Sequence, residues 1–355
     1  MTLVSRRRAW LGAATVLGGA MLVAGVVVPV PFVELSPGPT YNTLGEADGK
    51  PIISIQDTPT YPTSGNLDLT TVNERGGPGH PVYLGRVIVG WADPSVRVVP
   101  REAFYPDDVD PGQVAAENTA LFSDSESDAI AAALRYLKRP VITLTIVSQV
   151  VGGGPSDEKL EPGDVLQTID GVRITEPQTV TDTMKGVTPG EKVTIVVRPD
   201  EGKDPEKTVV ITTGKAPDDP NRAFLGIGVG TTYKAPFPIS VQLGGVGGPS
   251  AGTMLSLGIV DKLTPGELNG GKYVAGTGTI TPDGQVGPIG GIAQKLVGAR
   301  RAGATLFLAP ASNCDDVLAG GLPDGLTVAR ISTLADAVTA IEAYVAGKPV
   351  PACTR

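Results

Sequence analysis

A continuous apolar segment near the N-terminus constrains this chain more than any other feature. Residues 9–28 contain no charged side chain, and Arg6, Arg7 and Arg8 precede them directly. A helix of that length rises about 30 Å, which matches the hydrocarbon thickness of a bilayer. Because positively charged flanks stay in the cytoplasm, we expect residues 1–8 to be cytoplasmic, residues 9–30 to form a transmembrane anchor, and the remaining chain to be extracytoplasmic.

A cleaved signal peptide is the alternative for this segment. The apolar core of a signal peptide normally spans about 7–15 residues and ends at a small-x-small cleavage site. The observed segment is longer and lacks such a site. We therefore favour an uncleaved single-pass anchor in the cell membrane, with a helix that ends at Pro29 and Pro31.

Composition limits the chemistry of the remaining chain. The net charge is −8 and no long basic run follows the N-terminus, which argues against nucleic-acid binding. One His and two Cys are too few for a clustered zinc site, so we expect neither a metal nor a cofactor. On the oxidising side of a membrane, Cys314 and Cys353 could form a disulfide that holds the tail to the last domain. The sequence leaves their state open.

The length of 355 residues predicts a multidomain protein of the α+β class. Residues 31–125 predict a β-rich extracytoplasmic region, because short β-type runs at 52–55, 67–72 and 83–89 are separated by Pro, Gly and Asn. Apolar spacing over residues 127–137 predicts a helix that leads into the next domain.

The next segment reads as strands around a short helix. Its predicted elements are strands at 141–151, 164–169 and 193–197, an Asp170-Gly171 turn and a helix at 179–185. Within it, LEPGDVLQTIDG at 160–171 resembles a segment typical of bacterial PDZ domains. This resemblance implies a PDZ-like domain at 126–213.

The PDZ resemblance implies that a peptide could add as an extra strand at a sheet edge. In that family a glycine-containing carboxylate loop precedes the receiving strand. The segment Lys138–Val141 precedes the first expected strand and contains no glycine. The binding of free C-termini is therefore left open.

Residues 214–222 have the composition of a linker, and a final α/β domain is expected at 223–345, followed by a tail at 346–355. Its predicted elements are strands at 225–229 and 305–308 and helices at 251–263, 292–302 and 334–345.

A G-x-S-x-G motif at Gly248–Gly252 indicates a serine presented at the start of a helix. Small neighbours would let a substrate carbonyl approach Ser250 closely. The backbone N–H groups of Ala251 and Gly252 could then stabilise an oxyanion. Short glycine motifs recur by chance in a chain with 47 Gly, so the motif alone assigns no role.

The base that would activate Ser250 is not a downstream histidine, because the only histidine, His80, lies far upstream. Lysine or a carboxylate is the remaining choice. Among the lysines after the serine, Lys295 shares a predicted helix face with apolar and small residues. Burial there could lower its pKa from about 10.4 toward about 7–8, as a lysine base requires. The alternative is a surface lysine whose stem packs while its amine reaches water.

The segment Gly266–Tyr273 resembles a P-loop but does not fit one. Tyr273 replaces the Ser or Thr that would bind Mg²⁺, and no helix pattern follows. We expect no nucleotide binding.

Five ordered motifs resemble the proteolytic domain of the Lon protease family: GPSAG at 248–252, AGTGTI at 275–280, GQVGPIGG at 284–291, QK at 294–295 with RAGA at 301–304, and FLAPASN at 307–313. In that family the serine of the first motif is the nucleophile and the lysine of the later helix is the base. The resemblance assigns these roles to Ser250 and Lys295. Gly247 departs from the family pattern, which usually has an acidic residue two positions before the proline.

The whole chain resembles bacterial membrane-anchored proteins that join a PDZ domain to a Lon-type domain without the ATPase of Lon. This resemblance implies an ATP-independent serine endopeptidase that acts on unfolded or flexible extracytoplasmic proteins. It is also compatible with a homo-oligomer. The alternatives are a catalytically inactive PDZ-based binding or scaffold protein at the membrane, and a protein that processes only itself. The sequence does not specify the natural substrate or the cleavage preference.

Overall fold

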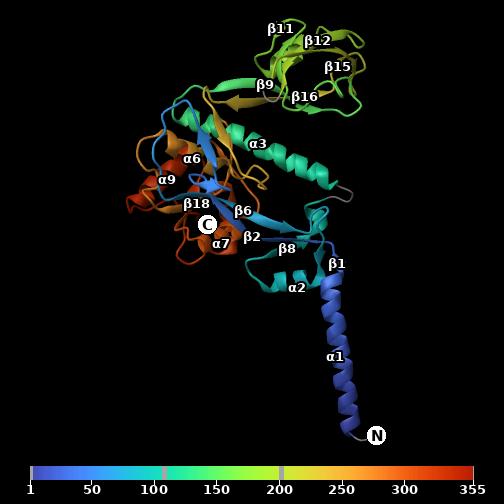
Figure 1. Cartoon of the computed structure of the whole chain (residues 1–355), viewed down its shortest axis with the longest axis vertical. Helices are drawn as coiled ribbons and strands as arrows, with labels where there is room; N and C mark the ends of the chain where they lie inside the picture. The colour runs from blue at the N-terminus through green and yellow to red at the C-terminus, as the bar shows by residue number, and fades with distance from the viewer. Residues whose placement is uncertain (1–2, 106–109, 200–203, 355) are drawn as a thin grey trace. The chain divides into compact units, whose positions relative to one another are not determined.

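The computed structural model describes residues 3–105, 110–199 and 204–354 (Figure 1). The chain forms two compact units. Unit 1 joins Met1–Leu137 to Phe237–Arg355, and unit 2 is the intervening segment Lys138–Pro236. The expected mixed α+β multidomain class is confirmed, whereas the units divide the chain differently from the expected domains.

The N-terminal helix α1 (Leu3–Val27) contains the apolar segment recognised in the sequence. Its part Trp10–Val27 has a mean hydropathy of 1.9 and packs against no core. Eighteen helical residues rise about 27 Å. Among the described helices, α1 alone is long and apolar enough to cross a bilayer. The predicted apolar helix is confirmed, and its role as an anchor stays a prediction.

A six-stranded sheet is the framework of unit 1. In spatial order its strands are β22 (Thr327–Ile331), β21 (Leu306–Pro310), β18 (Tyr273–Gly276), β6 (Asn66–Arg75), β2 (Phe32–Asn42) and β8 (Arg97–Pro100). The first four run parallel, whereas β2 is antiparallel to both β6 and β8. Segments on either side of unit 2 in the sequence therefore build one sheet.

The β-rich region expected at 31–125 does not stand apart from the final domain. Its strand β6 pairs with β18 from Asn66↔Tyr273 to Leu69↔Gly276. Leu67 and Leu69 are 0% and 1% exposed. Because β18 is a short strand between β21 and β6, its backbone groups are satisfied only when both halves of unit 1 are present.

Helices cover both faces of this sheet. The main ones are α3 (Pro111–Tyr136), α6 (Gly252–Leu263), α7 (Ile292–Ala302), α8 (Cys314–Gly320) and α9 (Leu334–Val345). The sequence predicts α7 and α9 with these bounds and α6 to within one residue. Helix α3 begins earlier than expected, at Pro111, because Asp110 caps it by accepting a hydrogen bond from the backbone N–H of Gln113.

Alternate residues of β21 show which helix covers which face. Phe307 packs in one core cluster with Leu296 of α7. The neighbouring Leu308 lies on the opposite face, where it and Met254 of α6 both approach Gly276. Helices α6 and α7 therefore lie on opposite faces of the sheet.

Short elements complete unit 1. They are β1 (Pro29–Val30), β3 (Glu46–Ala47), β4 (Lys50–Pro51), β5 (Ile53–Ile55), β7 (Val82–Tyr83), β17 (Ile239–Val241), β19 (Thr279–Ile280), β20 (Val286–Gly287), and the 3₁₀ turns Arg101–Ala103 and Ala311–Asn313.

The strand predicted at 83–89 is wrong, because most of it belongs to helix α2 (Leu84–Ala92). The β-branched run at 87–89 favours a strand locally. However, the buried positions are Val87 and Gly90, which are one helical turn apart. Contacts of one helical face therefore override the local preference.

The tail at 346–355 is held to unit 1. Cys314 and Cys353 form a disulfide across 39 residues. The backbone N–H of Arg330 also donates to the carbonyl of Pro351 at 2.8 Å. The disulfide that the sequence left open is thus present.

Unit 2 is an antiparallel sheet with one main helix, α4 (Pro177–Met184). Its strands in spatial order are β13 (Lys207–Thr212), β12 (Lys192–Arg198), β10 (Val165–Ile169), β9 (Ile142–Val150) and β16 (Ile227–Lys234), with β11 (Val172–Arg173) beside β10 and the small pair β14 (Gly214–Lys215) and β15 (Ala223–Phe224). The Asp170-Gly171 turn joins β10 to β11, as predicted, and both residues have positive φ.

The bounds of unit 2 differ from the domain expected at 126–213. Residues 126–136 lie in α3 of unit 1, where Ser125 and Glu126 bond to other unit 1 segments. At the other end, the linker expected at 214–222 leads into β16, which pairs with β9 from Ile227↔Val150 to Lys234↔Ile142. The strand expected at 225–229 thus belongs to unit 2, because a long strand pairing holds it there.

We predict that a fragment of residues 223–355 will not fold by itself. It lacks β6 and therefore leaves one edge of β18 without its partner, together with the apolar surface that Leu67 and Leu69 cover. Circular dichroism and urea unfolding can measure this, with residues 31–355 as the matched control. Cooperative unfolding of the short fragment at the urea concentration of the control would contradict the prediction.

Candidate active site

Ser250 lies in a tight turn immediately before α6. Gly248 has φ +81°, a conformation that favours glycine. A Cβ on Gly252 would lie 2.8 Å from both Ile280 Cγ2 and Ser125 Oγ, so a larger residue does not fit there. The two glycines of the motif are thus needed to present the serine.

Hydrogen bonds fix the turn to its surroundings. The carbonyl of Ser250 accepts from the backbone N–H of Gly278 at 3.0 Å and from Thr277 Oγ1 at 3.1 Å. The carbonyl of Pro249 accepts from Ser125 Oγ of α3 at 2.9 Å. The turn therefore sits at the carboxyl end of β18, with α3 holding its other side.

Lys295 lies in the first turn of α7 and is 3% exposed. The helix starts after Gly291, which has φ +69°. The carbonyl of Gly291 accepts a hydrogen bond from the backbone N–H of Lys295. Burial disfavours the charged amine and lowers the pKa of Lys295 from 10.5 to about 7. A substantial fraction of this lysine is therefore neutral at pH 7, as a base must be.

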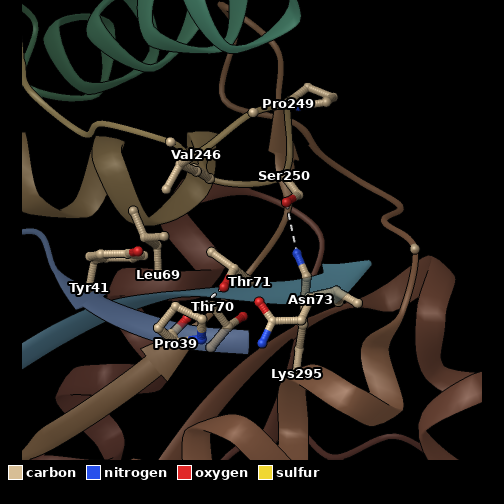
Figure 2. A pocket seen from close by; sticks show the side chains of 15 residues that line it. Pro39, Tyr41, Leu69, Thr70, Thr71, Asn73, Val246, Pro249, Ser250 and Lys295 are labelled. Carbon is tan, nitrogen blue, oxygen red and sulfur yellow. Dashed lines mark hydrogen bonds between the residues drawn. The ribbon is translucent and has the colours of Figure 1, made fainter. Parts of the chain in front are cut away.

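The two predicted residues meet. Lys295 Nζ lies 2.7 Å from Ser250 Oγ, and Figure 2 shows the two side chains pointing toward one another. The alternative of a lysine whose amine reaches water is wrong, because the amine is enclosed within unit 1. The sequence-based pairing of Ser250 with Lys295 agrees with this geometry.

Thr277 is a third member of the cluster that the sequence did not single out. Its Oγ1 accepts from Lys295 Nζ at 2.9 Å and donates to the carbonyl of Ser250. The residue is fully buried, so its one donor and its acceptor are both used within the cluster. Thr277 lies within the AGTGTI motif, yet only the tertiary fold brings it to the amine.

The N–H groups of Ala251 and Gly252 open α6 directly after the serine. The first N–H groups of a helix have no acceptor within it. In the described part of the chain, no acceptor is bonded to either group. They are available to a developing negative charge beside Ser250.

A cavity of 380 Å³ opens beside the pair (Figure 2). Its walls come from β2, β6 and the loop before Ser250, and include Pro39, Tyr41, Leu69, Thr70, Thr71, Val72, Asn73, Val246 and Pro249. β18 pairs with β6 only as far as Leu69. Of the β6 residues that line the cavity, Thr70, Thr71, Val72 and Asn73 thus lie beyond this pairing.

Two other sequence features lie elsewhere. His80 closes a turn in which its N–H donates to Gly77 and its carbonyl accepts from Gly76. The P-loop-like segment forms turns that lead into β18. Within residues 3–105, 110–199 and 204–354, no group of three or more His, Cys, Asp and Glu is arranged to hold a metal ion.

Unit 2 has a separate groove between α4 and the edge strand β16, with a volume of 440 Å³. Val180, Met184, Ile227 and Val229 give it an apolar lining. Gly226, with φ +74°, directly precedes β16.

The glycine-free segment noted in the sequence, residues 138–141, does not precede an edge strand. Residues 138–141 precede β9, which is an interior strand between β10 and β16 and has no edge to offer. An edge of the sheet beside this groove is β16, and the loop before it contains a glycine, Gly226. The order of strands in space, which the sequence does not display, decides this.

Comparisons with known proteins agree with this site. Residues 239–341 match the family described as the Lon protease (S16) C-terminal proteolytic domain. Lon protease 2 of Herpetosiphon aurantiacus is 43% identical over 95 residues, and Lon protease 1 of Bacillus subtilis is 39% identical over 89 residues. These matches cover 26% and 24% of this chain and 11% of each relative. The chain thus contains a Lon-type serine protease domain and matches about a tenth of the length of those relatives.

Solved structures similar to this chain include PDZ domains. The PDZ domain of the SdrC-like protein from Listeria monocytogenes is 21% identical, with a TM-score of 0.22, over 24% of this chain and 85% of that one. A solution structure from Geobacillus thermodenitrificans is 22% identical, with a TM-score of 0.21, over 24% of this chain and 94% of that one.

Burial of Lys295 makes the stability of unit 1 depend on pH. The folded-state pKa, about 7, is below the unfolded value, so the unfolded chain binds more protons between these two pKa values. The free energy of unfolding should therefore fall as the pH decreases from about 10 to about 7, by up to about 1.4 kcal/mol per pH unit for this group. Urea unfolding of Lys295→Met at several pH values should lack this component.

Lys262→Met is the control, because burial also lowers the pKa of Lys262 but that lysine lies at the far end of α6. It should keep the component that Lys295 contributes. An identical pH slope in wild type and Lys295→Met would contradict an amine buried in its neutral form.

Proposed function

We propose that this protein is a serine endopeptidase in which Ser250 is the nucleophile and Lys295 is the general base. The observation that carries the proposal is the 2.7 Å contact between Ser250 Oγ and an amine whose pKa burial lowers to about 7. A neutral amine within hydrogen-bond reach of a hydroxyl can accept its proton as the hydroxyl attacks.

In the first half of the reaction, Ser250 Oγ attacks the peptide carbonyl while its proton passes to Lys295 Nζ. The carbonyl oxygen becomes an oxyanion, which the N–H groups of Ala251 and Gly252 stabilise. The C–N bond then breaks, and Lys295 returns the proton to the leaving amine. The products of this half are a free amine and an ester between the substrate and Ser250.

In the second half, a water molecule attacks the ester and gives its proton to Lys295. Release of the new carboxyl group returns the proton to Ser250 Oγ. Thr277 acts as a positioning residue throughout, because its hydroxyl holds both the amine and the carbonyl of the serine. Its bond to Lys295 helps to hold the amine beside Ser250 Oγ.

The substrates proposed are unfolded or flexible protein segments. The cavity is bounded by β6 beyond its pairing with β18, so an extended peptide can lie along Thr71–Asn73 beside the serine. An unfolded segment exposes its backbone N–H and C=O groups for such pairing, whereas most of these groups in a folded domain are already bonded within it. The proposed reaction needs no ATP, because each step uses groups of unit 1 and water.

The groove of unit 2 is proposed to recruit such segments. The edge strand β16 can add a peptide strand, and the apolar lining from α4 can hold its side chains. Gly226 gives the preceding loop room for a close backbone approach.

We further propose that α1 anchors the protein in the cell membrane with both units on the extracytoplasmic side. The apolar segment Trp10–Val27 and the three arginines before it support this orientation. The disulfide between Cys314 and Cys353 suits an oxidising compartment.

Ser250→Ala and Lys295→Met should each lower cleavage of a labelled, permanently unfolded protein by at least about 1,000-fold, because each removes one partner of a unit. The full chain in lipid nanodiscs, without nucleotide, is the sample. Lys272→Met, which removes an exposed lysine, is the control and should cleave normally. Wild-type turnover in either dyad variant would overturn the assignment of Ser250 and Lys295. A wild-type protein that binds peptide in the unit 2 groove but cleaves nothing would favour a scaffold protein.

The rate constant kcat/KM should rise with pH around pH 7 and then level off, because the neutral form of Lys295 is the active one. Thr277→Val removes an acceptor that favours the ammonium form, so the rise should move to lower pH while kcat falls by about 10–100-fold. Thr277→Ser keeps the hydroxyl and should restore both. A Thr277→Val enzyme with unchanged pH profile would show that this threonine only fills space.

A further inference from the structure

The short helix α2 (Leu84–Ala92) turns an apolar face to the outside of unit 1. Ile88, Val89 and Trp91 are 53%, 65% and 62% exposed. A surface helix normally buries its apolar face and exposes its polar one. A cluster of large exposed apolar side chains on one helix therefore calls for a partner.

The rotation of α2 is held by contacts to the body of unit 1. Val87 is fully buried, and a Cβ on Gly90 would lie 3.0 Å from Val98 Cγ2, so this side packs tightly. The one charged side chain of α2, Arg86, is half exposed and pairs with the buried Glu34 of β2, which is 1% exposed. Its Nε and Nη2 donate to the two carboxylate oxygens at 2.9 and 2.8 Å. Because Val87 and Gly90 face the body of unit 1, the opposite face of α2 carries the exposed apolar side chains.

Helix α2 begins against the last turn of α1 (Figure 1). A Cβ on Gly25 would lie 3.4 Å from the Cα of Gly85, so the two backbones touch without side chains between them. The N–H of Leu84 donates to the carbonyl of Val28 at 3.0 Å, and Pro29 pairs with Tyr83. Because Gly25 lies inside the apolar segment of α1, the first turn of α2 is level with the end of that segment.

We infer that α2 is an interfacial helix that lies in the surface of the bilayer crossed by α1, with Ile88, Val89 and Trp91 in the lipid. The inference rests on the proposed anchor. The depth of α2 follows from its contact with Gly25, since a helix level with the end of a membrane span meets the headgroup region. Tryptophan favours that region, because its ring is apolar and its N–H finds polar partners there. Helices of this kind bury one apolar face at the acyl boundary.

Helix α2 would be a second attachment of unit 1 to the membrane, in addition to α1. A single helix would let unit 1 swivel about its anchor, whereas α1 and α2 together hold unit 1 at a defined height and rotation above the lipid. The bidentate pair of Arg86 with Glu34 transmits this hold directly to β2, whose other end lines the cavity beside Ser250.

Tryptophan fluorescence can test the inference, because the chain has only Trp10 and Trp91. The full-length Trp10→Phe variant is placed in nanodiscs of phosphatidylcholine and phosphatidylglycerol that carry bromine either near the headgroup or near the chain ends. We expect the emission of Trp91 to be lost more with shallow than with deep bromine, and to be protected from aqueous iodide. Trp91→Phe keeps Trp10 and reports separately whether α1 is inserted.

Tyr61→Trp in the chain that lacks both native tryptophans is the matched control. The side chain of Tyr61 is exposed, and its backbone N–H donates to the carbonyl of Lys262, which holds the position in unit 1. Its emission should respond to iodide and not to brominated lipid. Quenching of Trp10 without quenching of Trp91 would overturn the interfacial helix and leave the anchor intact. Trp91 shielded from both quenchers would assign its face to a protein partner and also overturn the inference. If Trp10 were not quenched, the anchor itself would fall.

Discussion

The parallel pairing of β6 with β18 is the interaction on which the rest of unit 1 depends. It joins Asn66–Leu69 to Tyr273–Gly276 and so unites two segments that are separated by all of unit 2. The chain leaves β18 directly into Thr277, which contacts both Lys295 and the carbonyl of Ser250. The pairing that orders the centre of the sheet therefore also places the residue that follows β18 beside the candidate dyad.

The burial of Lys295 shows how a stable core and a reactive group oppose one another. Desolvation lowers the pKa of the lysine, and its polar partners are the neutral hydroxyls of Ser250 and Thr277. A nearby carboxylate would favour the charged amine and remove its basicity. The surrounding core, including Leu296 and Ala299 on α7, must therefore offset the cost of enclosing an amine without an opposite charge.

Unit 2 is an insertion that leaves the sheet of unit 1 intact. The chain departs after α3 and returns before β17, which pairs with β5 of unit 1. The proposed recruitment and cleavage of peptides would therefore reside in separate cores, each with its own strand edge: β16 in unit 2 and β6 beyond Leu69 in unit 1. The match to the Lon proteolytic domain spans residues 239–341, which include Ser250 and Lys295 and begin after unit 2.

The sequence alone was sufficient for features that depend on neighbouring residues. The apolar run of α1, the periodicity of α7 and α9, and the Asp170-Gly171 turn are local signals. The ordered motifs were enough to pair Ser250 with Lys295. Only the tertiary structure decided that β6 completes the sheet, that Thr277 joins the cluster, that β16 is an edge, and that α2 is a helix with its apolar face outward. These features depend on contacts between segments that are distant in the sequence, and residue spacing within one segment does not reveal which other segment it contacts.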